Sequence, residues 1–348
     1  MKLDISRTLA FDRTRNFPQP LILLGAVTIA ASAFAIPRTR DSTQASSPQL
    51  PAAAPADSTT QIQFRNVDFY VDPQIPLRIH QLRGTMRSKT GGMVFFDEKA
   101  SYIIHIDAAE VGLAPRDLSL LLNKYVFGYP GAPLKRLQVS ISGNEMILKG
   151  ILRKVLDVPF EMRASLSVTP EGLIRIHPTR TELMGMHVDG LMKALGLALD
   201  EIINLRKAHG ATLKGNDIFL DPPKFLPPPT IEGKLSAVRV AGNEVLQTFA
   251  PVGAVPPPLS VPDPAAQNYM YYRGGVLRFG KLVMLDADML ITELDTSDTF
   301  RFNLDRYQAQ LVAGYSRTLP SQGLEVFMRD VDKLGGGPAE ITVGPARR

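Results

Sequence analysis

The stretch Val188-Asp-Gly-Leu-Met-Lys-Ala-Leu-Gly-Leu-Ala-Leu-Asp-Glu-Ile-Ile-Asn-Leu205 is the segment on which the expected fold depends. Its apolar residues recur at the three- and four-residue intervals that mark one face of an α-helix. The stripe consists of Leu191, Leu195, Ala198, Ile202 and Leu205, widened by Ala194, Leu197 and Leu199. Something apolar must cover such a stripe. The helix either packs on a sheet as an ordinary core element or lines a cavity that holds an acyl chain.

The chain before this helix is rich in strand-like segments. They share β-branched and aromatic residues in partial alternation with polar ones. The segments are 62–71, 77–87, 101–108, 135–142, 145–153, 158–168 and 173–177. Turn residues such as Ser142-Gly-Asn144 join the later ones and predict an antiparallel meander. A second apolar helix is expected to begin at Asp117 or the preceding Pro115 and to continue to Phe127, where Gly128 and Pro130 end it.

After the long helix, strand-like segments alternate with proline-rich stretches. The segments 213–220 and 231–240 are separated by Pro222 to Pro229, and prolines cannot sit inside a central strand. A proline-rich linker at 251–267 then precedes a β-rich block at 268–334. The sequence leaves open whether that block completes the same sheet or forms a separate lid.

The N-terminal residues 1–35 are expected to be a signal peptide or a signal anchor. A basic stretch precedes the apolar run Leu21 to Ile36, and Ala33-Phe-Ala35 has the pattern of a cleavage site. As a helix the run would span roughly 24 Å, less than the roughly 30 Å of a bilayer core, which favours cleavage over anchoring. The chain is therefore expected to be exported to the periplasm or cell envelope, with 36–60 as a flexible Pro/Ala/Ser/Thr linker.

Composition narrows the possible functions. The 348 residues are 45% hydrophobic and 21% charged, as in a globular protein with a substantial core. Removal of residues 1–35, which carry a net charge of +2, lowers the formal charge from +5 to +3, so there is no basis for nucleic-acid binding. The chain has no cysteine, so an exported form must fold without disulfides.

No catalytic motif is present, and we expect a protein that is not an enzyme and has no cofactor. The nucleophile elbow, the zinc-protease helix and the two glycine-rich phosphate-binding loops are all missing. The five histidines are scattered singly along the chain. The acidic group Asp286, Asp288, Glu293, Asp295 and Asp298 lacks the spacing of a calcium loop. We interpret it as a solvated strand face, with no metal expected.

The order and spacing of these elements resemble the LmeA-like phospholipid-binding family, part of the TULIP-like tubular lipid-binding group. The resemblance extends over residues 61–250 at most. It rests on the segments Asp117 to Phe127, Gln138 to Ser142, Met146 to Gly150, Val158 to Val168, Gly172 to Ile176, Gly190 to Leu205, Gly215 to Asp221 and Ile231 to Val240. The Pro222 to Pro229 insertion and the block from Tyr269 to Leu334 have no counterpart in the family.

The resemblance implies an α+β fold, in which a strongly curved antiparallel sheet wraps around a long apolar helix and a β-rich C-terminal extension follows. It also implies a hydrophobic groove that takes phospholipid or another acyl-chain lipid, with a membrane surface as a second candidate partner. The wall positions, chosen by periodicity, are Leu121, Tyr125, Leu191, Leu195, Ala198, Leu199 and Ile202. The alternative is a structural module of the envelope with a packed core and no cavity. Residues 335–348 are expected to be a flexible tail.

Overall fold

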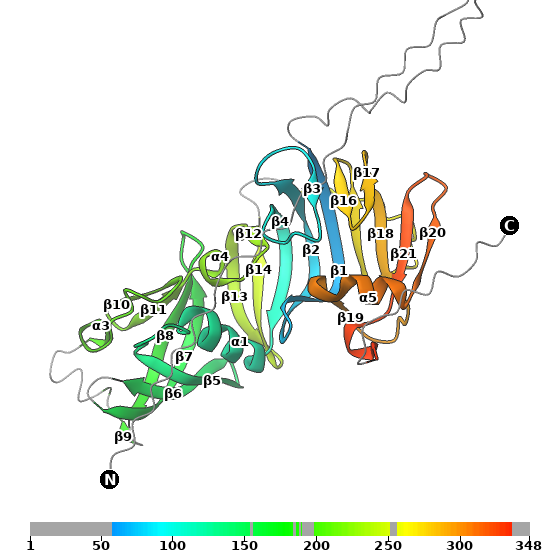
Figure 1. The fold of residues 1–348 in the computed structure, drawn as a ribbon. Coiled ribbons are helices and arrows are strands. Elements are labelled where there is room, and N and C mark those ends of the chain that lie inside the picture. Colours follow the sequence, from blue (N-terminus) through cyan, green and yellow to red (C-terminus); the bar gives the residue numbers. More distant parts are fainter. Residues whose placement is uncertain are drawn as a thin grey trace, which may run out of the picture. The chain divides into compact units, whose positions relative to one another are not determined.

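Three β-sheets make up most of the part of the chain that the structure describes (Figure 1). The structure is a computed structural model, and it describes residues 58–153, 156–183, 186–187, 189, 198–250 and 256–335. The sheets have eleven, seven and three strands. The expected signal segment, the 36–60 linker up to residue 57, and the tail from residue 336 lie outside the described residues.

The eleven-stranded sheet begins with three long strands that follow one another in the sequence and pair antiparallel. They are β1 (Thr59–Asp72), β2 (Ile75–Ser88) and β4 (Tyr102–Leu113). In β2, Ile75, Leu77 and Ile79 lie at alternate positions on the buried face. This period of two is the signal of a half-buried strand, and the three strands expected in this region are confirmed.

Further strands extend this sheet beyond β4. β14 (Glu244–Phe249) pairs antiparallel with β4, and β13 (Leu235–Ala241) pairs with β14. The short β12 (Thr230–Glu232) runs parallel to β4.

The C-terminal block continues the same sheet on the other side of β1. Its strands follow in the order β15, β18, β21 and β20. The strand β19 pairs parallel with residues 67–70 of β1. The bounds are β15 (Tyr269–Arg273), β18 (Asp288–Glu293), β19 (Phe300–Asn303), β20 (Tyr315–Thr318) and β21 (Leu324–Met328). Of the two arrangements that the sequence leaves open, the structure has the completed sheet. A small sheet consists of β3 (Val94–Phe95), β16 (Leu277–Phe279) and β17 (Leu282–Met284). It joins the N-terminal strands to the C-terminal block, because β3 pairs with β16.

The seven-stranded sheet is the expected antiparallel meander, extended by a hairpin. Its strands follow in the order β10, β11, β8, β7, β6 and β5, and β9 pairs with β8. The bounds are β5 (Leu134–Ser142), β6 (Glu145–Arg153), β7 (Asp157–Val168), β8 (Ile174–Leu183), β9 (Met186–His187), β10 (Ala211–Lys214) and β11 (Asp217–Leu220). The strand-like segment 213–220 is thus a hairpin, because Gly215 has φ of 58° and turns the chain.

The described helices are short. α1 (Pro115–Leu121) continues into the π-helical turn η1 (Leu122–Val126), which confirms the helix expected at 117–127. The others are α3 (Leu199–Ile202), α4 (Pro222–Phe225) and α5 (Tyr307–Val312), with 3₁₀ turns η2 (Leu304–Arg306) and η3 (Val331–Lys333). No described helix is both long and apolar enough to cross a membrane.

The expected fold class, a sheet wrapped around a long apolar helix in an α+β protein, is wrong. Within residues 198–205 the helix is the single turn α3, and Ile203 leaves it with φ of −116° and ψ of 128°. Side chains of the neighbouring hairpin turn and of α3 bind each other's backbone: Asn216 Oδ1 accepts from the Leu199 N–H, and Asp200 Oδ2 accepts from the Gly215 N–H. Beyond α3, Ile203 and Leu205 point to one side as alternate residues of an extended chain.

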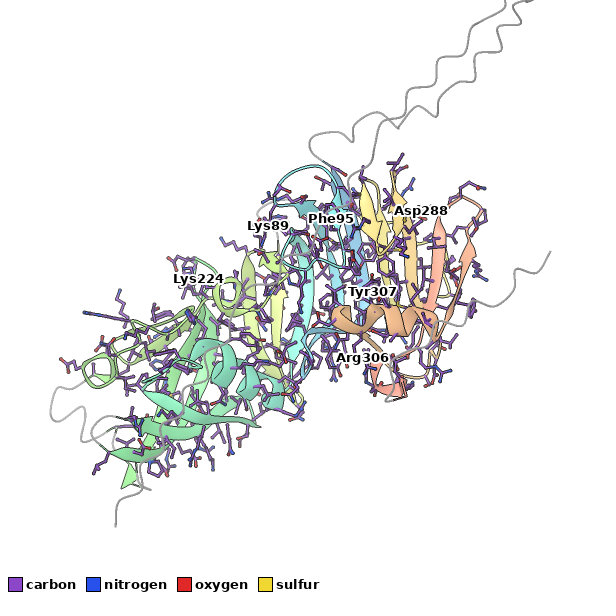
Figure 2. The ribbon with its side chains drawn as sticks, viewed as in Figure 1. Lys89, Phe95, Lys224, Asp288, Arg306 and Tyr307 are labelled. Carbon is purple, nitrogen blue, oxygen red and sulfur yellow. The ribbon has the colours of Figure 1, made fainter. Side chains whose placement is uncertain are left out.

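A single hydrophobic core runs through the eleven-stranded and seven-stranded sheets and includes residues of the small sheet. The Phe96 ring is at the centre of its aromatic part, 5.1 Å from Phe279, 5.4 Å from Tyr272 and 6.0 Å from Phe302 between ring centroids. Tyr307 lies at the start of α5 (Figure 2). Its ring packs on Phe279, with centroids 4.9 Å apart. This core therefore links the strands of the N-terminal half to those of the C-terminal block.

Candidate functional site

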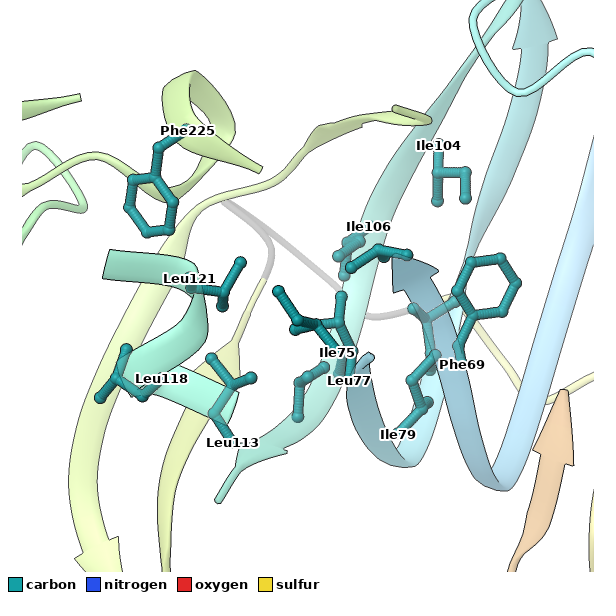
Figure 3. Close-up of a cluster of buried hydrophobic side chains, with 14 of the residues drawn as sticks. Phe69, Ile75, Leu77, Ile79, Ile104, Ile106, Leu113, Leu118, Leu121 and Phe225 are labelled. Atoms are coloured by element: carbon teal, nitrogen blue, oxygen red, sulfur yellow. The ribbon is translucent and has the colours of Figure 1, made fainter. Parts of the chain in front are cut away.

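The strongest candidate site is an apolar cavity between the two large sheets. One wall is the buried face of the eleven-stranded sheet, where Leu77 and Ile79 of β2 face the same space as Ile104 and Ile106 of β4 (Figure 3). Phe69 of β1 lies beside them. Because these side chains occupy alternate strand positions, they form a continuous apolar surface.

The opposite wall comes from the seven-stranded sheet and from α1. Met146, Leu166 and Ile176 belong to β6, β7 and β8, and Leu118 is on α1. Leu166 is only half-buried, whereas Met146 and Ile176 are buried. The cavity is therefore bounded by strands that are distant in the sequence.

The proline-rich segment 222–229 closes one side of this space. Pro222, Pro223, Phe225, Leu226 and Pro229 all contribute to the lining. Pro222 begins α4, where a missing N–H is tolerated, and the turn directs the Phe225 ring inward toward Leu118 and Leu121 of α1 (Figure 3). The 222–229 segment thus forms part of the cavity wall.

The cavity is narrow and almost free of polar groups. The cavity volume is about 70 Å³, and the surrounding non-protein space, which includes the open mouth, is about 1040 Å³. A cavity of 70 Å³ would hold on the order of five waters, yet a buried water needs two to four polar partners. Gln247 is the one polar residue among those that line it, so water is held poorly and hydrocarbon can replace it.

Gln247 is placed by the alternation of β14. Val245, Gln247 and Phe249 occupy every second position and all three line the cavity, while Leu246 and Thr248 lie on the other face. The side chain of Gln247 is buried, with 6% of its surface exposed. It is an amide in an otherwise apolar wall, able to donate a hydrogen bond to an ester or carboxyl oxygen.

A second apolar pocket lies farther along the seven-stranded sheet. Leu148 and Met162 line it from β6 and β7, and Leu199, Ile203 and Leu205 line it from α3 and the extended segment that follows. Its non-protein space is about 600 Å³. Residues expected on one long helix thus contribute to this pocket from a short turn and an extended chain.

The predicted wall residues do not meet in one place. Leu121 is fully buried in the core beside the first cavity, Leu199 lines the second pocket, and Ala198 is the half-buried residue that precedes α3. Leu191 and Leu195 lie outside the described residues, as does the side chain of Ile202 at the end of α3. The strand residues of the wall and the 222–229 segment were not predicted from the sequence. Alternation within the strands was the signal that could have identified the strand residues.

Tyr125, another predicted wall residue, is part of a polar cluster at the end of β1. Its hydroxyl donates to Asp72 Oδ2 at 2.6 Å, and Lys124 also binds that carboxylate. Burial raises the pKa of Asp72, but the hydrogen bonds from Lys124, Tyr125 and the Gln74 N–H outweigh this, so its pKa is below the ordinary value. The ionised carboxylate therefore fixes the π-helical turn against the β1–β2 hairpin.

We expect Asp72→Asn to lower the free energy of unfolding by about 1–2 kcal/mol at pH 7, because charge-assisted hydrogen bonds are lost. The contribution of a carboxylate with a lowered pKa is fully present above its unfolded pKa of about 3.9 and is lost as the pH falls through the folded value. Urea unfolding of both proteins from pH 7 to pH 2.5 measures this difference. An equal difference at both ends of that range would contradict the assignment.

Asp286 and Asp288, both expected on a solvated strand face, differ in burial. Asp286 is exposed, but Asp288 is buried and accepts hydrogen bonds from Tyr271 Oη at 2.9 Å and Ser321 Oγ at 2.6 Å. Burial and the adjacent Asp288 raise the pKa of Tyr271, which keeps the phenol protonated as the donor. The hydrogen bond between Tyr271 and Asp288 is thus a structural contact within the sheet.

Comparison of the chain with family models, with curated proteins and with solved structures finds no match.

Proposed function

We propose that this chain is an exported, non-enzymatic envelope protein that binds the acyl chain of a phospholipid or lipid-linked intermediate in the cavity between its two large sheets. The observation that carries the proposal is the lining, in which Gln247 is the one polar residue. Since the fold differs from the one that the LmeA-like resemblance implied, the proposal rests on this cavity and not on that resemblance.

The energy of binding would come from burial of hydrocarbon. At about 0.8 kcal/mol per buried CH₂, a chain segment of about five methylene groups, which would replace the roughly five waters of the cavity, supplies on the order of 4 kcal/mol before the costs of association and ordering. The rest of a long acyl chain would lie in the open mouth. A narrow space of this kind suits a flexible polymethylene chain better than a rigid ring system. Gln247 would supply the single polar contact, to an ester or carboxyl oxygen.

The first test is mass spectrometry of an organic extract from the purified chain, residues 36–348, produced by export in a bacterium. We expect a stoichiometric phospholipid or fatty acid. Titration of the delipidated protein with a fluorescent fatty acid should then show saturable binding at about one site. A clean extract from folded protein, together with no saturable binding, would reject the proposal and favour a structural module with a packed core.

A further inference from the structure

Three carboxylates converge at one end of the C-terminal part of the large sheet. Glu293 is the last residue of β18, Asp298 follows in the loop before β19, and Asp330 lies between β21 and η3. One oxygen of each carboxylate lies within 4.8 Å of the others. Two oxygens bound to one Ca²⁺ ion are separated by at most about 5 Å, twice the usual metal–oxygen distance, so the three can share one ion.

Glu293 directs an unsatisfied oxygen into this group. Its side chain is fully buried, with 0% exposed, and its Oε2 accepts from Asn268 Nδ2 at 2.8 Å. Its Oε1 has no hydrogen-bond partner among the described residues. A buried carboxylate oxygen without a donor is unfavourable unless a cation or proton satisfies it.

The cations that are present only partly compensate the acidic group. Lys333 Nζ is 3.0 Å from Asp330 Oδ2 and 3.3 Å from Asp298 Oδ1, but 4.0 Å from Glu293 Oε1, beyond hydrogen-bond distance. Arg301 Nη1 lies 2.9 Å from Asp298 Oδ2. Asp295 also contacts Lys333 and Asp332 also contacts Arg301, so five carboxylates surround one ammonium and one guanidinium.

Lys333 is 35% exposed, so its amine can move into solvent without disturbing the core.

We propose that Glu293, Asp298 and Asp330 form a calcium-binding site, and that Lys333 occupies it as a built-in cation until Ca²⁺ displaces the amine. The ligands are carboxylate oxygens, which suit a hard cation with flexible coordination. Backbone carbonyls and water would complete the coordination. A bound ion would hold the β18–β19 loop to η3, and this role is independent of the apolar cavity.

Isothermal titration calorimetry of the full exported chain, stripped with EDTA, tests the proposal with CaCl₂ alone. We expect one site with a dissociation constant on the order of 10⁻⁴–10⁻³ M, as in extracellular calcium modules. Glu293→Gln keeps the shape of the side chain and should weaken binding at least about tenfold. Lys333→Gln should strengthen it, because the competing ammonium is gone. Asp286→Asn, which removes an exposed carboxylate elsewhere in the C-terminal block, should leave it unchanged.

Opposite effects of the Glu293 and Lys333 substitutions would establish the site. The proposal is overturned if the wild-type chain shows no heat of binding up to about 10 mM CaCl₂, which is ten times the largest dissociation constant expected. It is also overturned if Glu293→Gln binds as the wild type does, or if Lys333→Gln binds no more tightly. Asp298→Asn, at a partly exposed position, replaces Glu293→Gln if that variant does not fold.

Discussion

Phe96→Ala should lower the free energy of unfolding by about 3–5 kcal/mol, the usual loss for a fully buried phenylalanine. Phe96 is 1% exposed, and its ring meets aromatic side chains of β4, β15, β16 and β19. Removal of the ring leaves a cavity where the N-terminal strands meet the C-terminal block. Urea unfolding followed by circular dichroism measures the change.

The matched control is the adjacent residue. Phe95 is half-buried, and its ring is covered by the Arg278 guanidinium at 4.7 Å. Phe95→Ala should therefore lower stability by only about 1 kcal/mol. A similar loss in both variants, or two separate unfolding transitions in the wild type, would contradict a continuous core through residues 58–335.

Leu166→Trp should lower the affinity for a fatty acid by about 100-fold, on the condition that the proposed cavity is the site. Leu166 is half-buried on β7 and lines the cavity, so a larger ring can occupy the space without displacing a fully buried neighbour. If the indole excludes about four methylene groups, roughly 3 kcal/mol of binding is lost. Titration of the delipidated variant with a fluorescent fatty acid measures the effect.

Leu213→Trp is the control for this substitution. Leu213 is also a half-buried strand leucine, but it lines the second pocket. Its replacement should leave the affinity within about twofold of the wild type, since it does not touch the proposed chain path. Full affinity in folded Leu166→Trp would exclude the first cavity, and a loss confined to Leu213→Trp would place the ligand in the second pocket.

The strands were predictable from the sequence because their signal is local. Alternation of Leu77 and Ile79 with polar neighbours is enough to identify β2, and the glycine and proline after Phe127 are enough to end the α1–η1 helix. The long helix was predicted wrongly because its apolar stripe fits two structures. Leu205, a residue of that stripe, is buried from an extended segment as well as it would be from a helical face. The hydrogen bonds that Asn216 and Asp200 accept, which favour a short turn, are tertiary.

The cavity and the acidic site depend on contacts that no local pattern encodes. Leu166 and Ile79 face one space only because two sheets pack face to face. Asp288 was expected on a solvated strand face, but it begins β18, a strand in which every residue is buried. Asp330, which joins Glu293 and Asp298, is separated from them by five elements of the chain and gave no signal of its own.

The position of β1 determines when this protein can fold during synthesis. One edge of β1 pairs with β2, which follows it directly, but the other edge pairs with β15 and β19. The contact between Gln63 and Tyr269 spans 206 residues. Until the ribosome has made the last third of the chain, β1 therefore presents an open strand edge of the kind that joins other chains. A version that stops at residue 250 would retain both walls of the cavity but would be prone to aggregation through that edge.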